Sequence, residues 1–424
     1  MTNARPDPYG PLVATALEIP PIVSVDDHVI EPPDLWQRWL PIRFREDGPK
    51  VVRARWEIVP SGRQGYRLAP DGPFDASDFW VYGGFSAGID VGMAAAGIPV
   101  DQQRGGPIGF DEMRPGCWRL ADRLADMDAN GVERSMCFPT FPRFCGQVFL
   151  EAVATRGEDS ELALACVRAY NDWTVEEWAG ESGGRLIPCI IVPLWDPQLA
   201  ADEIRRNAAR GVRAVTFSEM PQYLGLPSLY ARDCHWDPFL EACDETSTVV
   251  CLHIGSASVS MRSAEDAPAG ANITLTAINS QFCMTDWLMS GAMARFPRLK
   301  LAFSESQVGW MPYHLQRMDV VWRKFHDSPV ASLPPEMTEP PSAYVKGRLF
   351  GCVVEDDLGL RQRGLGVDQL TFESDYPHMD SSWPTTAQYA ARVLAEAEYT
   401  QEEANKVLRE NAIDLFDLPA TLPD

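Results

Sequence analysis

Short apolar or β-branched runs alternate with amphipathic helical patterns along almost the whole chain. The runs cover residues 22–28, 134–140, 185–193, 213–219, 248–255, 299–306, 349–356 and 369–377. This alternation predicts parallel strands joined by crossover helices, and unbroken apolar runs predict strands buried on both faces. Eight such units favour a closed (β/α)8 TIM barrel, an α/β fold, over an open sheet. No GxGxxG follows any run, so a dinucleotide-binding fold is not supported.

We expect the barrel to occupy residues 21–424 and to end in a long helix from Thr385 to about Leu415. One segment, from Pro41 to Pro115, breaks the rhythm, because it is long and rich in Gly, Pro, Asp and aromatic residues. It follows the first strand, at the end of the barrel where active sites of this fold lie. The sequence therefore predicts a lid or substrate-pocket insertion over about 41–115.

The aromatic residues of this insertion allow two interpretations. They are Phe74, Phe79, Trp80, Tyr82 and Phe85. They either supply an apolar cover for the barrel mouth or form a small core of the insertion itself. Residues 1–20 precede the first strand, and we expect them to form a flexible arm or a strap on a neighbouring surface.

The charge of the chain excludes several classes of partner. A net charge of −23 and a pI near 4.7 argue against a nucleic-acid binder and against docking on anionic lipid. No run reaches the ~18 apolar residues that a membrane span requires, and the first twenty residues lack the pattern of a secretory signal. None of the ten cysteines forms a CxxC pair. We therefore expect a cytoplasmic protein with reduced, mostly buried thiols.

Polar residues fall where the predicted strands end. The first strand ends on Asp26 and His28, which are two residues apart and so share one face of the strand. The fifth ends on His253, the sixth is followed by Glu305, and Asp375 follows the eighth, with His378 just beyond it in SDYPHMD. The ends of barrel strands meet at one mouth, so these carboxylates and imidazoles would face one another there. Two imidazoles and two carboxylates, from Asp26, His28, His253 and Asp375, match a mononuclear metal site.

Each of these residues also has a structural interpretation. Asp375 could cap the next helix, His253 could be a hydrogen-bonded core residue, Glu305 could pair with an arginine, and His378 could belong to a surface turn. Their joint position at successive strand ends favours the metal site. Glu31 could orient His28 or cap a turn, and Glu373 faces inward two residues before Asp375.

The remaining histidines are weaker candidates. His235 precedes a helix in HWDP and could line the pocket. His314 and His326 lie on a helical stretch, where we expect structural roles.

The motifs VDDHVIEPPDLW, VVCLHIGS, FSESQVGWMPYHLQRMD and FESDYPHMDSSWP together resemble the amidohydrolase-related superfamily, in the branch of the aminocarboxymuconate-semialdehyde and resorcylate decarboxylases. The resemblance covers nearly the whole chain. The HxH motif of the family corresponds here to Asp26-x-His28, its strand-five histidine to His253 and its strand-eight aspartate to Asp375.

The sequence departs from the decarboxylases at strand six. Their catalytic histidine is replaced by Glu305, in SESQVGW, which puts decarboxylation in doubt. A carboxylate can bridge two metal ions, and three carboxylates with three imidazoles exceed what one open metal site needs. The sequence is also similar to a small branch of the superfamily that uses a dinuclear non-haem iron site for oxygenation.

Three hypotheses follow, and the first is a dinuclear iron (or Fe/Mn) monooxygenase. It would use O₂ to hydroxylate an unactivated carbon of a bulky carboxylic acid or its thioester. Asp26, His28, Glu305 and Asp375 would hold one ion, and His253 with His378 the other, with Glu305 or Asp375 bridging. Glu305 and His378 would also act in catalysis.

The second hypothesis is a hydrolase or decarboxylase with one Zn or Mn ion and Glu305 as general base. The third is a catalytically silent scaffold that pairs with an active homologue. Both enzyme hypotheses imply a small-molecule substrate, and the family resemblance implies a homodimer or higher homo-oligomer.

Overall fold

The computed structural model describes residues 17–59, 65–157 and 159–423 of the chain. Its main sheet consists of β1 (Ile22–Val29), β6 (Val132–Pro139), β7 (Leu186–Ile187), β8 (Cys189–Ile190), β9 (Ala214–Phe217), β10 (Val249–His253), β11 (Leu301–Ser304), β12 (Leu349–Val353) and β13 (Leu370–Phe372). All pairings in this sheet are parallel. Each predicted run overlaps one of these strands, except that the run 185–193 contains both β7 and β8, so the strand predictions are confirmed.

The sheet closes through a strand that is interrupted at Pro188. The spatial order is β7-β6-β1-β13-β12-β11-β10-β9-β8, so the two ends of the sheet are β7 and β8. These two are separated in the chain by Pro188 alone. Since proline offers no backbone N–H to the ladder, the strand pairs with β6 before it and with β9 after it. The nine segments thus form the eight strands of a closed barrel, as predicted.

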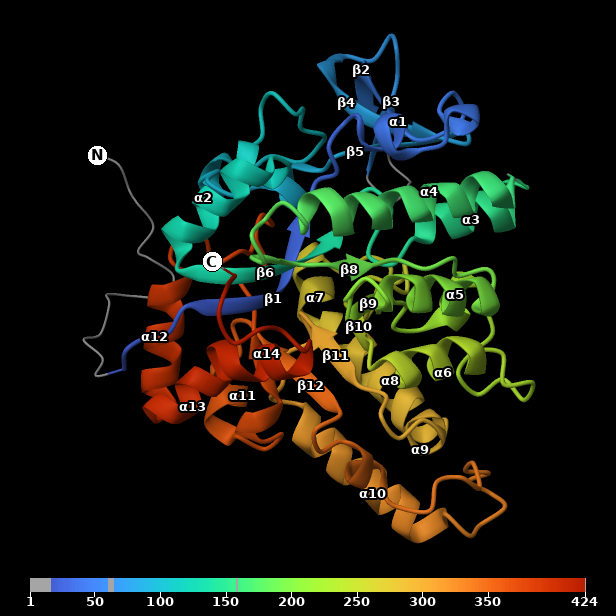
Figure 1. Ribbon diagram of the computed structural model, residues 1–424, viewed down its shortest axis with the longest axis vertical. Coiled ribbons are helices and arrows are strands. Elements are labelled where there is room, and N and C mark those ends of the chain that lie inside the picture. Colours follow the sequence, from blue (N-terminus) through green and yellow to red (C-terminus); the bar gives the residue numbers. More distant parts are fainter. Residues whose placement is uncertain (1–16, 60–64, 158, 424) are drawn as a thin grey trace.

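Helices cover the outside of the barrel (Figure 1). They are α2 (Leu120–Asn130), α3 (Gln147–Arg156), α4 (Ser160–Trp173), α5 (Pro197–Ala208), α6 (Asp237–Thr246), α7 (Ala269–Thr274), α8 (Thr276–Met289), α9 (Ala292–Arg295), α10 (Met311–Phe325) and α11 (Asp357–Gln362). Local sequence sets their ends: Asp196 accepts the N–H groups of Gln198 and Leu199 at the start of α5, and Gly131 ends α2 at a φ of 74°.

The predicted C-terminal helix is wrong in one respect, because it is not continuous. The structure has α12 (Thr386–Glu396), α13 (Gln401–Asn405), the π-helical turn η9 (Lys406–Glu410) and α14 (Asn411–Leu415). Thr400 begins α13 with a capping box to Glu403, which favours a new helix start over continuation of α12. Ala412 and Phe416 pack against residues inside the barrel, including Val23 and Phe350, so the end of the chain closes the barrel floor.

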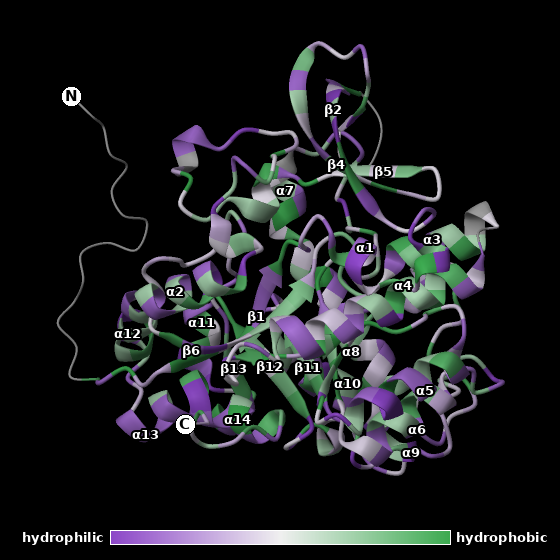
Figure 2. Ribbon diagram, turned by 45° about the horizontal axis from the view of Figure 1, so that its top comes forward, coloured by the Kyte–Doolittle hydropathy of each residue, from purple (hydrophilic) through white to green (hydrophobic). Residues whose placement is uncertain are grey.

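The segment predicted as an insertion contains a separate antiparallel sheet. It follows α1 (Leu35–Trp39) and has the order β3-β2-β4-β5, from β2 (Lys50–Ile58), β3 (Tyr66–Leu68), β4 (Phe74–Tyr82) and β5 (Phe85–Gly88). The sheet stands on the barrel near the C-terminal end of β1 (Figure 2). Short 3₁₀ helices follow: η2 (Val91–Ala94), η3 (Val100–Gln102) and η4 (Pro115–Cys117).

The interpretation as a small core of the insertion is confirmed for Phe79, whereas the apolar cover over the barrel mouth stays a prediction. Phe79 forms a small core with Trp56 and Tyr66 inside the insertion. Trp80 instead packs against Trp36 and Phe141 of the barrel, with ring centroids 5.1 and 4.8 Å away. This packing fastens the insertion sheet to the barrel.

Most of the expected N-terminal arm, residues 1–16, lies outside the described residues. The part that is described, 17–20, lies on this chain itself: Glu18 exchanges two hydrogen bonds with Gln401 on α13. In the described part of the chain no helix is both long and apolar enough to cross a bilayer. The expected homo-oligomer stays a prediction.

Candidate metal centre

A β-bulge in β1 aims its last polar residues at the barrel mouth. Val23 and Val25 face the barrel interior, and strict alternation would turn Asp26 and His28 outward. The pairing with β6 shifts between Ser24 and Asp27, where β1 carries one extra residue. The shift reverses the alternation, so Asp26 and His28 point inward above the apolar floor.

Two other strands deliver their side chains through strained turns. Glu305 follows β11 directly and Asp375 lies three residues beyond β13, both with a φ of 51°. Left-handed backbone is uncommon outside glycine and often marks functional sites. The N–H of Asp375 donates to the carbonyl of Asp26 at 3.0 Å, and that of Glu305 to the Glu373 carboxylate at 3.3 Å.

One group of donors consists of Asp26, His28 and His253. His28 Nε2 lies 3.1 Å from His253 Nε2 and 3.6 Å from Asp26 Oδ1, and His253 Nε2 lies 3.4 Å from Asp26 Oδ2. All three side chains are inaccessible to solvent.

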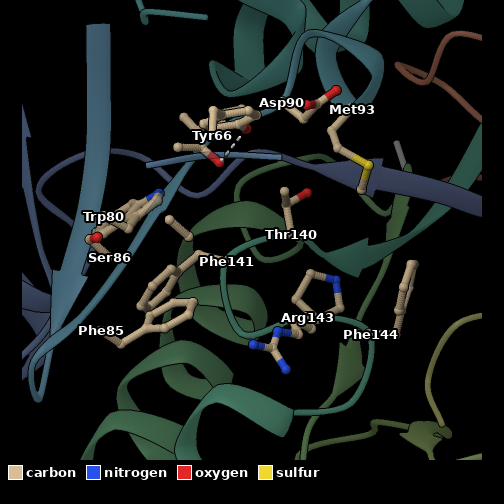
Figure 3. Close-up of a pocket in the computed structure, with 14 residues that line it drawn as sticks. Tyr66, Trp80, Phe85, Ser86, Asp90, Met93, Thr140, Phe141, Arg143 and Phe144 are labelled. Atoms are coloured by element: carbon tan, nitrogen blue, oxygen red, sulfur yellow. Dashed lines mark hydrogen bonds between the residues drawn. The ribbon is translucent and has the colours of Figure 1, made fainter. Parts of the chain in front are cut away.

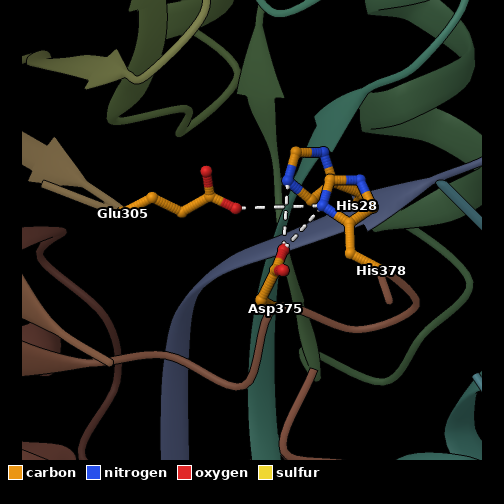
Figure 4. A group of neighbouring side chains, drawn as sticks. All are labelled: His28, Glu305, Asp375 and His378. Atoms are coloured by element: carbon orange, nitrogen blue, oxygen red, sulfur yellow. Dashed lines mark ion pairs between the residues drawn. The ribbon is translucent and has the colours of Figure 1, made fainter. Parts of the chain in front are cut away.

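A second group shares His28 and adds Glu305, Asp375 and His378 (Figure 4). Asp375 Oδ1 lies 3.4 Å from His28 Nε2 and 2.9 Å from His378 Nδ1. Glu305 reaches in from the opposite side, 3.8 Å from His378 Nδ1 and 3.8 Å from His253 Nε2. The structure thus brings all six predicted side chains together. Their grouping differs from our prediction, since His253 lies with Asp26, and His378 with Asp375 and Glu305.

The donor set fits a metal cation. Both carboxylate oxygens of Asp26 and Nε2 of His378 are buried with no hydrogen-bond partner among the described residues. Such orphaned polar atoms are costly unless a cation or water satisfies them. Ligand atoms about 2.1 Å from one ion lie roughly 3.0–3.5 Å apart, which matches the His28, His253 and Asp26 separations. Neutral imidazole and carboxylate together suit Zn, Mn or Fe.

The electrostatics of the cluster show the same demand for positive charge. Burial raises the pKa of Asp26 to about 6, and the nearby Glu305 adds to this effect. Burial, reinforced by the neighbouring His378 and His253, lowers the pKa of His28 well below 6.5 and keeps the ring in the neutral form that binds metals. Burial opposes the charged form of His253, but the carboxylates of Asp26 and Glu305 outweigh it and raise the pKa of the ring. A bound cation would lower the raised pKa values of Asp26 and His253, since it favours ionised carboxylates and neutral imidazoles.

Asp27 holds the strand ends in place from behind. Its Oδ1 accepts hydrogen bonds from Ser374 Oγ at 2.6 Å and from the N–H of Tyr376 at 3.0 Å, on either side of Asp375. Its Oδ2 accepts from Ser135 Oγ on β6. The buried Arg123 donates to the carbonyl of His28. These contacts fix the backbone that carries His28 and Asp375.

The sequence model of a known family, the amidohydrolases, matches residues 67–418 of this chain. The chain belongs to the amidohydrolase family. The expected resemblance is therefore confirmed at the level of the family. No curated protein matches the sequence significantly.

Several solved structures share the amidohydrolase fold. An amidohydrolase from Mycobacterium avium subsp. paratuberculosis K-10 has a TM-score of 0.66 and 22% identity, over 94% of this chain and 99% of its own. The 5-carboxyvanillate decarboxylase of Sphingomonas paucimobilis has a TM-score of 0.56 and 20% identity, over 72% of this chain and 85% of its own.

A dihydroxybenzoic acid decarboxylase from Polaromonas sp. JS666, solved with manganese and 2-nitroresorcinol, has a TM-score of 0.52 and 19% identity, over 72% of this chain and 88% of its own. At these identities the similarity concerns the fold. These relatives are amidohydrolases and decarboxylases, and they lend no support to an iron oxygenase.

The structure places the weaker candidates Glu31, Glu373 and His235 in three different surroundings. Glu373 contacts the Glu305 backbone, as a supporting residue should. Glu31 fits the second of its two predicted roles, since it accepts the N–H groups of Thr140 and Phe141 and so caps the turn after β6. His235 packs against Trp236 and lies outside both donor groups.

The two helical histidines have the structural contacts that we expect. His314 bonds Thr285. His326 stacks on Trp322 and contacts Asp327.

Sequence reasoning missed the aromatic residues that enclose the histidines. The Phe144 ring stacks on His253 with centroids 4.3 Å apart, and Phe138 meets the same imidazole edge-on at 4.8 Å. Phe138 lies near the end of the second strand run, one residue before β6 ends, where an inward position could have been inferred. Phe144 lies in an irregular loop, and no local pattern marks it. The role of Asp27 was missed too: alternation places it on the face opposite Asp26 and His28, but its partners Ser135, Ser374 and Tyr376 are known only from the structure.

Proposed function

We propose that this protein is a metal-dependent hydrolase. The observation that carries the proposal is the position of Glu305. The other five members of the cluster have side chains that are at most 8% exposed, whereas that of Glu305 is 22% exposed. Glu305 is therefore the donor with access to both a substrate and the buried ligands.

Asp26, His28 and His253 would hold one divalent ion, with Asp375 as a fourth ligand next to His28. When bound, such an ion supplies Lewis acidity, which polarises a substrate oxygen and lowers the pKa of a water ligand toward neutrality. His378 contacts Asp375 at 2.9 Å and orients its carboxylate.

Glu305 would serve as the general base. Without a metal ion, burial opposes the charged form of Glu305, but the neighbouring His253 and His378 outweigh burial and lower its pKa. A cation held by His253 and the other ligands would take over this effect and keep Glu305 ionised. An ionised carboxylate accepts a proton from water and so prepares a nucleophile. Decarboxylation needs the reverse, a group that delivers a proton to the substrate carbon, and an ionised Glu305 is poorly suited to that. This contrast favours hydrolysis over decarboxylation.

A second candidate function, dinuclear iron oxygenation, is favoured by one observation. The cluster divides into two donor groups that share His28, and Glu305, Asp375 and His378 exceed the needs of a single ion. Two iron ions would supply the redox chemistry that O₂ activation requires. The chain itself would contribute the carboxylates of Asp26, Glu305 and Asp375, which would offset three of the four positive charges of two divalent ions.

Metal content and oxygen dependence distinguish the two functions. Protein produced with iron, manganese or zinc is analysed for metal per chain and then assayed with and without oxygen on a panel of esters, lactones, amides and hydroxybenzoates. We expect one divalent ion per chain and oxygen-independent hydrolysis. Two irons per chain with oxygen consumption would instead establish the second candidate, and turnover of hydroxybenzoates alone would establish decarboxylation.

A further inference from the structure

A pocket of about 520 Å³ lies between the insertion sheet and the loop that follows β6 (Figure 3). Its volume is in the range that accepts a drug-sized organic molecule. Five of its fourteen lining residues are aromatic, among them Trp80 and Phe85 on the insertion side and Phe141 and Phe144 on the barrel side. Neither element forms this pocket alone.

The barrel-side wall is held rigidly. Thr140 and Phe141 donate their backbone N–H groups to the Glu31 carboxylate at 2.9 and 2.8 Å, and Thr140 Oγ1 donates to the Val29 carbonyl at 2.8 Å. Glu31 lies three residues beyond His28 on the same strand end. The wall of the pocket is therefore fixed to the strand that carries the metal candidates.

The pocket adjoins the metal centre through Phe144. This ring lines the pocket and also stacks on His253, with centroids 4.3 Å apart and planes inclined by 18°. The same ring meets His28 edge-on at 5.9 Å. A molecule seated between Phe85 and Phe144 thus has one end against the Phe144 ring, which itself contacts both histidines.

The charges in the pocket favour an anion. Among the described residues that line it, Arg143 is the cationic side chain and Asp90 the anionic one. Asp90 is the N-cap of η2 and accepts the N–H of Gly92 at 2.9 Å. This hydrogen bond partly satisfies its carboxylate.

Arg143 is only 17% exposed and lies near the Phe85 ring, while its partner Glu151, 3.1 Å away, is 37% exposed. Because the Glu151 side of the pair is open to solvent, water screens the interaction, and an arginine has further donors with which to bind a carboxylate or sulfonate. The chain as a whole carries a net charge of −23, so the cationic Arg143 would make this pocket favour anionic ligands over neutral ones.

We infer that this pocket binds the body of the substrate, and that the substrate class is an amphipathic organic anion: a bulky apolar or aromatic body with a negatively charged group recognised by Arg143. The insertion sheet then sets the size limit through Trp80 and Phe85, and Phe144 separates the bound body from the metal ligands. The inference rests on the proposed function where it places the reactive end of the substrate at the metal centre.

A matched pair of fluorescent ligands tests the pocket without turnover. 8-Anilinonaphthalene-1-sulfonate and N-phenyl-1-naphthylamine share one skeleton and differ by the sulfonate. We expect the wild-type protein to bind the sulfonate roughly ten- to a hundred-fold more tightly, because the charged group gains a charge-assisted hydrogen bond. Arg143→Gln should remove this preference and leave the affinity for the neutral ligand unchanged.

Three further variants complete the test. Arg143→Lys keeps the positive charge and should keep most of the preference. Arg67→Gln, on the same insertion but exposed and paired with Glu57, should change neither affinity. Ala87→Trp, which places a large side chain in the pocket lining, should lower the affinity for both ligands at least ten-fold.

Equal affinity for both ligands in the wild type, a preference that survives in Arg143→Gln, or unchanged binding to Ala87→Trp would each overturn the inference. Circular dichroism shows whether each variant is folded. Because binding is read by fluorescence, its failure is distinct from failure of the metal-dependent reaction, which is measured by metal content and turnover.

Discussion

The imidazole ring of His378 lies over that of His28, with ring centroids 3.6 Å apart and planes inclined by 23°. The two rings come from opposite ends of the chain, 350 residues apart, and Asp375 Oδ1 contacts both. Burial, reinforced by repulsion from the stacked His378 ring, lowers the pKa of His28 and so keeps it neutral. This pair marks the boundary between the two donor groups.

Substitutions in the two donor groups should therefore affect metal binding differently. Asp26→Asn should weaken Mn²⁺ or Zn²⁺ binding by roughly a hundred-fold or more, because loss of a direct ligand exceeds the 10- to 100-fold cost of losing a supporting residue. His378→Ala should retain one ion per chain. Calorimetric titration of the metal-free protein measures both. A fall from two ions to one in His378→Ala would instead favour the dinuclear site.

Glu305→Gln should lower kcat by roughly 10²- to 10⁴-fold, since the amide cannot accept a proton from water. Metal content should stay unchanged, because Glu305 is not among the proposed ligands. Glu339→Gln, an exposed glutamate elsewhere on the surface, is the matched control. Loss of the metal in Glu305→Gln would contradict the role of general base and identify Glu305 as a ligand.

Glu31 makes the stability of the protein depend on pH. Burial raises the pKa of this carboxyl from 4.5 to about 7. Between these pH values the folded chain keeps a proton that the unfolded chain releases, so stability falls as pH rises, by up to about 3 kcal/mol. Glu31→Gln lacks this titration. Urea unfolding of both proteins should show the wild type losing stability relative to the variant from about pH 5 to about pH 7, and a constant difference would refute the assignment.

Asp27→Asn should destabilise the fold by about 3 kcal/mol, because it removes the charge of a buried acceptor and turns an amide donor toward groups that already donate. Its partners are Ser135, Ser374 and the N–H of Tyr376. Asp34→Asn, at an exposed aspartate that pairs with Arg38, should cost less than 1 kcal/mol. Chemical denaturation compares the two, and equal effects would show that the Asp27 network contributes little.

All ten cysteines are free thiols, and nine of them are buried. The expectation that the thiols are mostly buried is thus confirmed, and their reduced state stays a prediction. A thiol reagent should titrate only Cys234 in the native protein and all ten thiols after unfolding, because reaction requires access to the thiolate. Cys234→Ser should then show no fast reaction. Rapid labelling of several native thiols would indicate that the barrel opens more readily than its packing implies.

The sequence by itself determined the barrel and the members of its polar cluster. Eight buried runs alternating with helices allow few topologies, because continuous apolar strands need cover on both faces and parallel strands need crossovers. Once the strands are placed, the mouth of the barrel follows. Asp26, His28, His253, Glu305, Asp375 and His378 could therefore be assembled from strand ends alone.

Only the tertiary structure decided how these residues are arranged and what surrounds them. The bulge after Ser24 sets which side chains of β1 face inward, and it depends on pairing with β6. Phe144 reaches His253, and Arg143 reaches the insertion, through an irregular loop whose course is fixed by Glu31 more than a hundred residues earlier. Local sequence cannot encode such contacts, because their free energy arises from packing between segments that are distant in the chain.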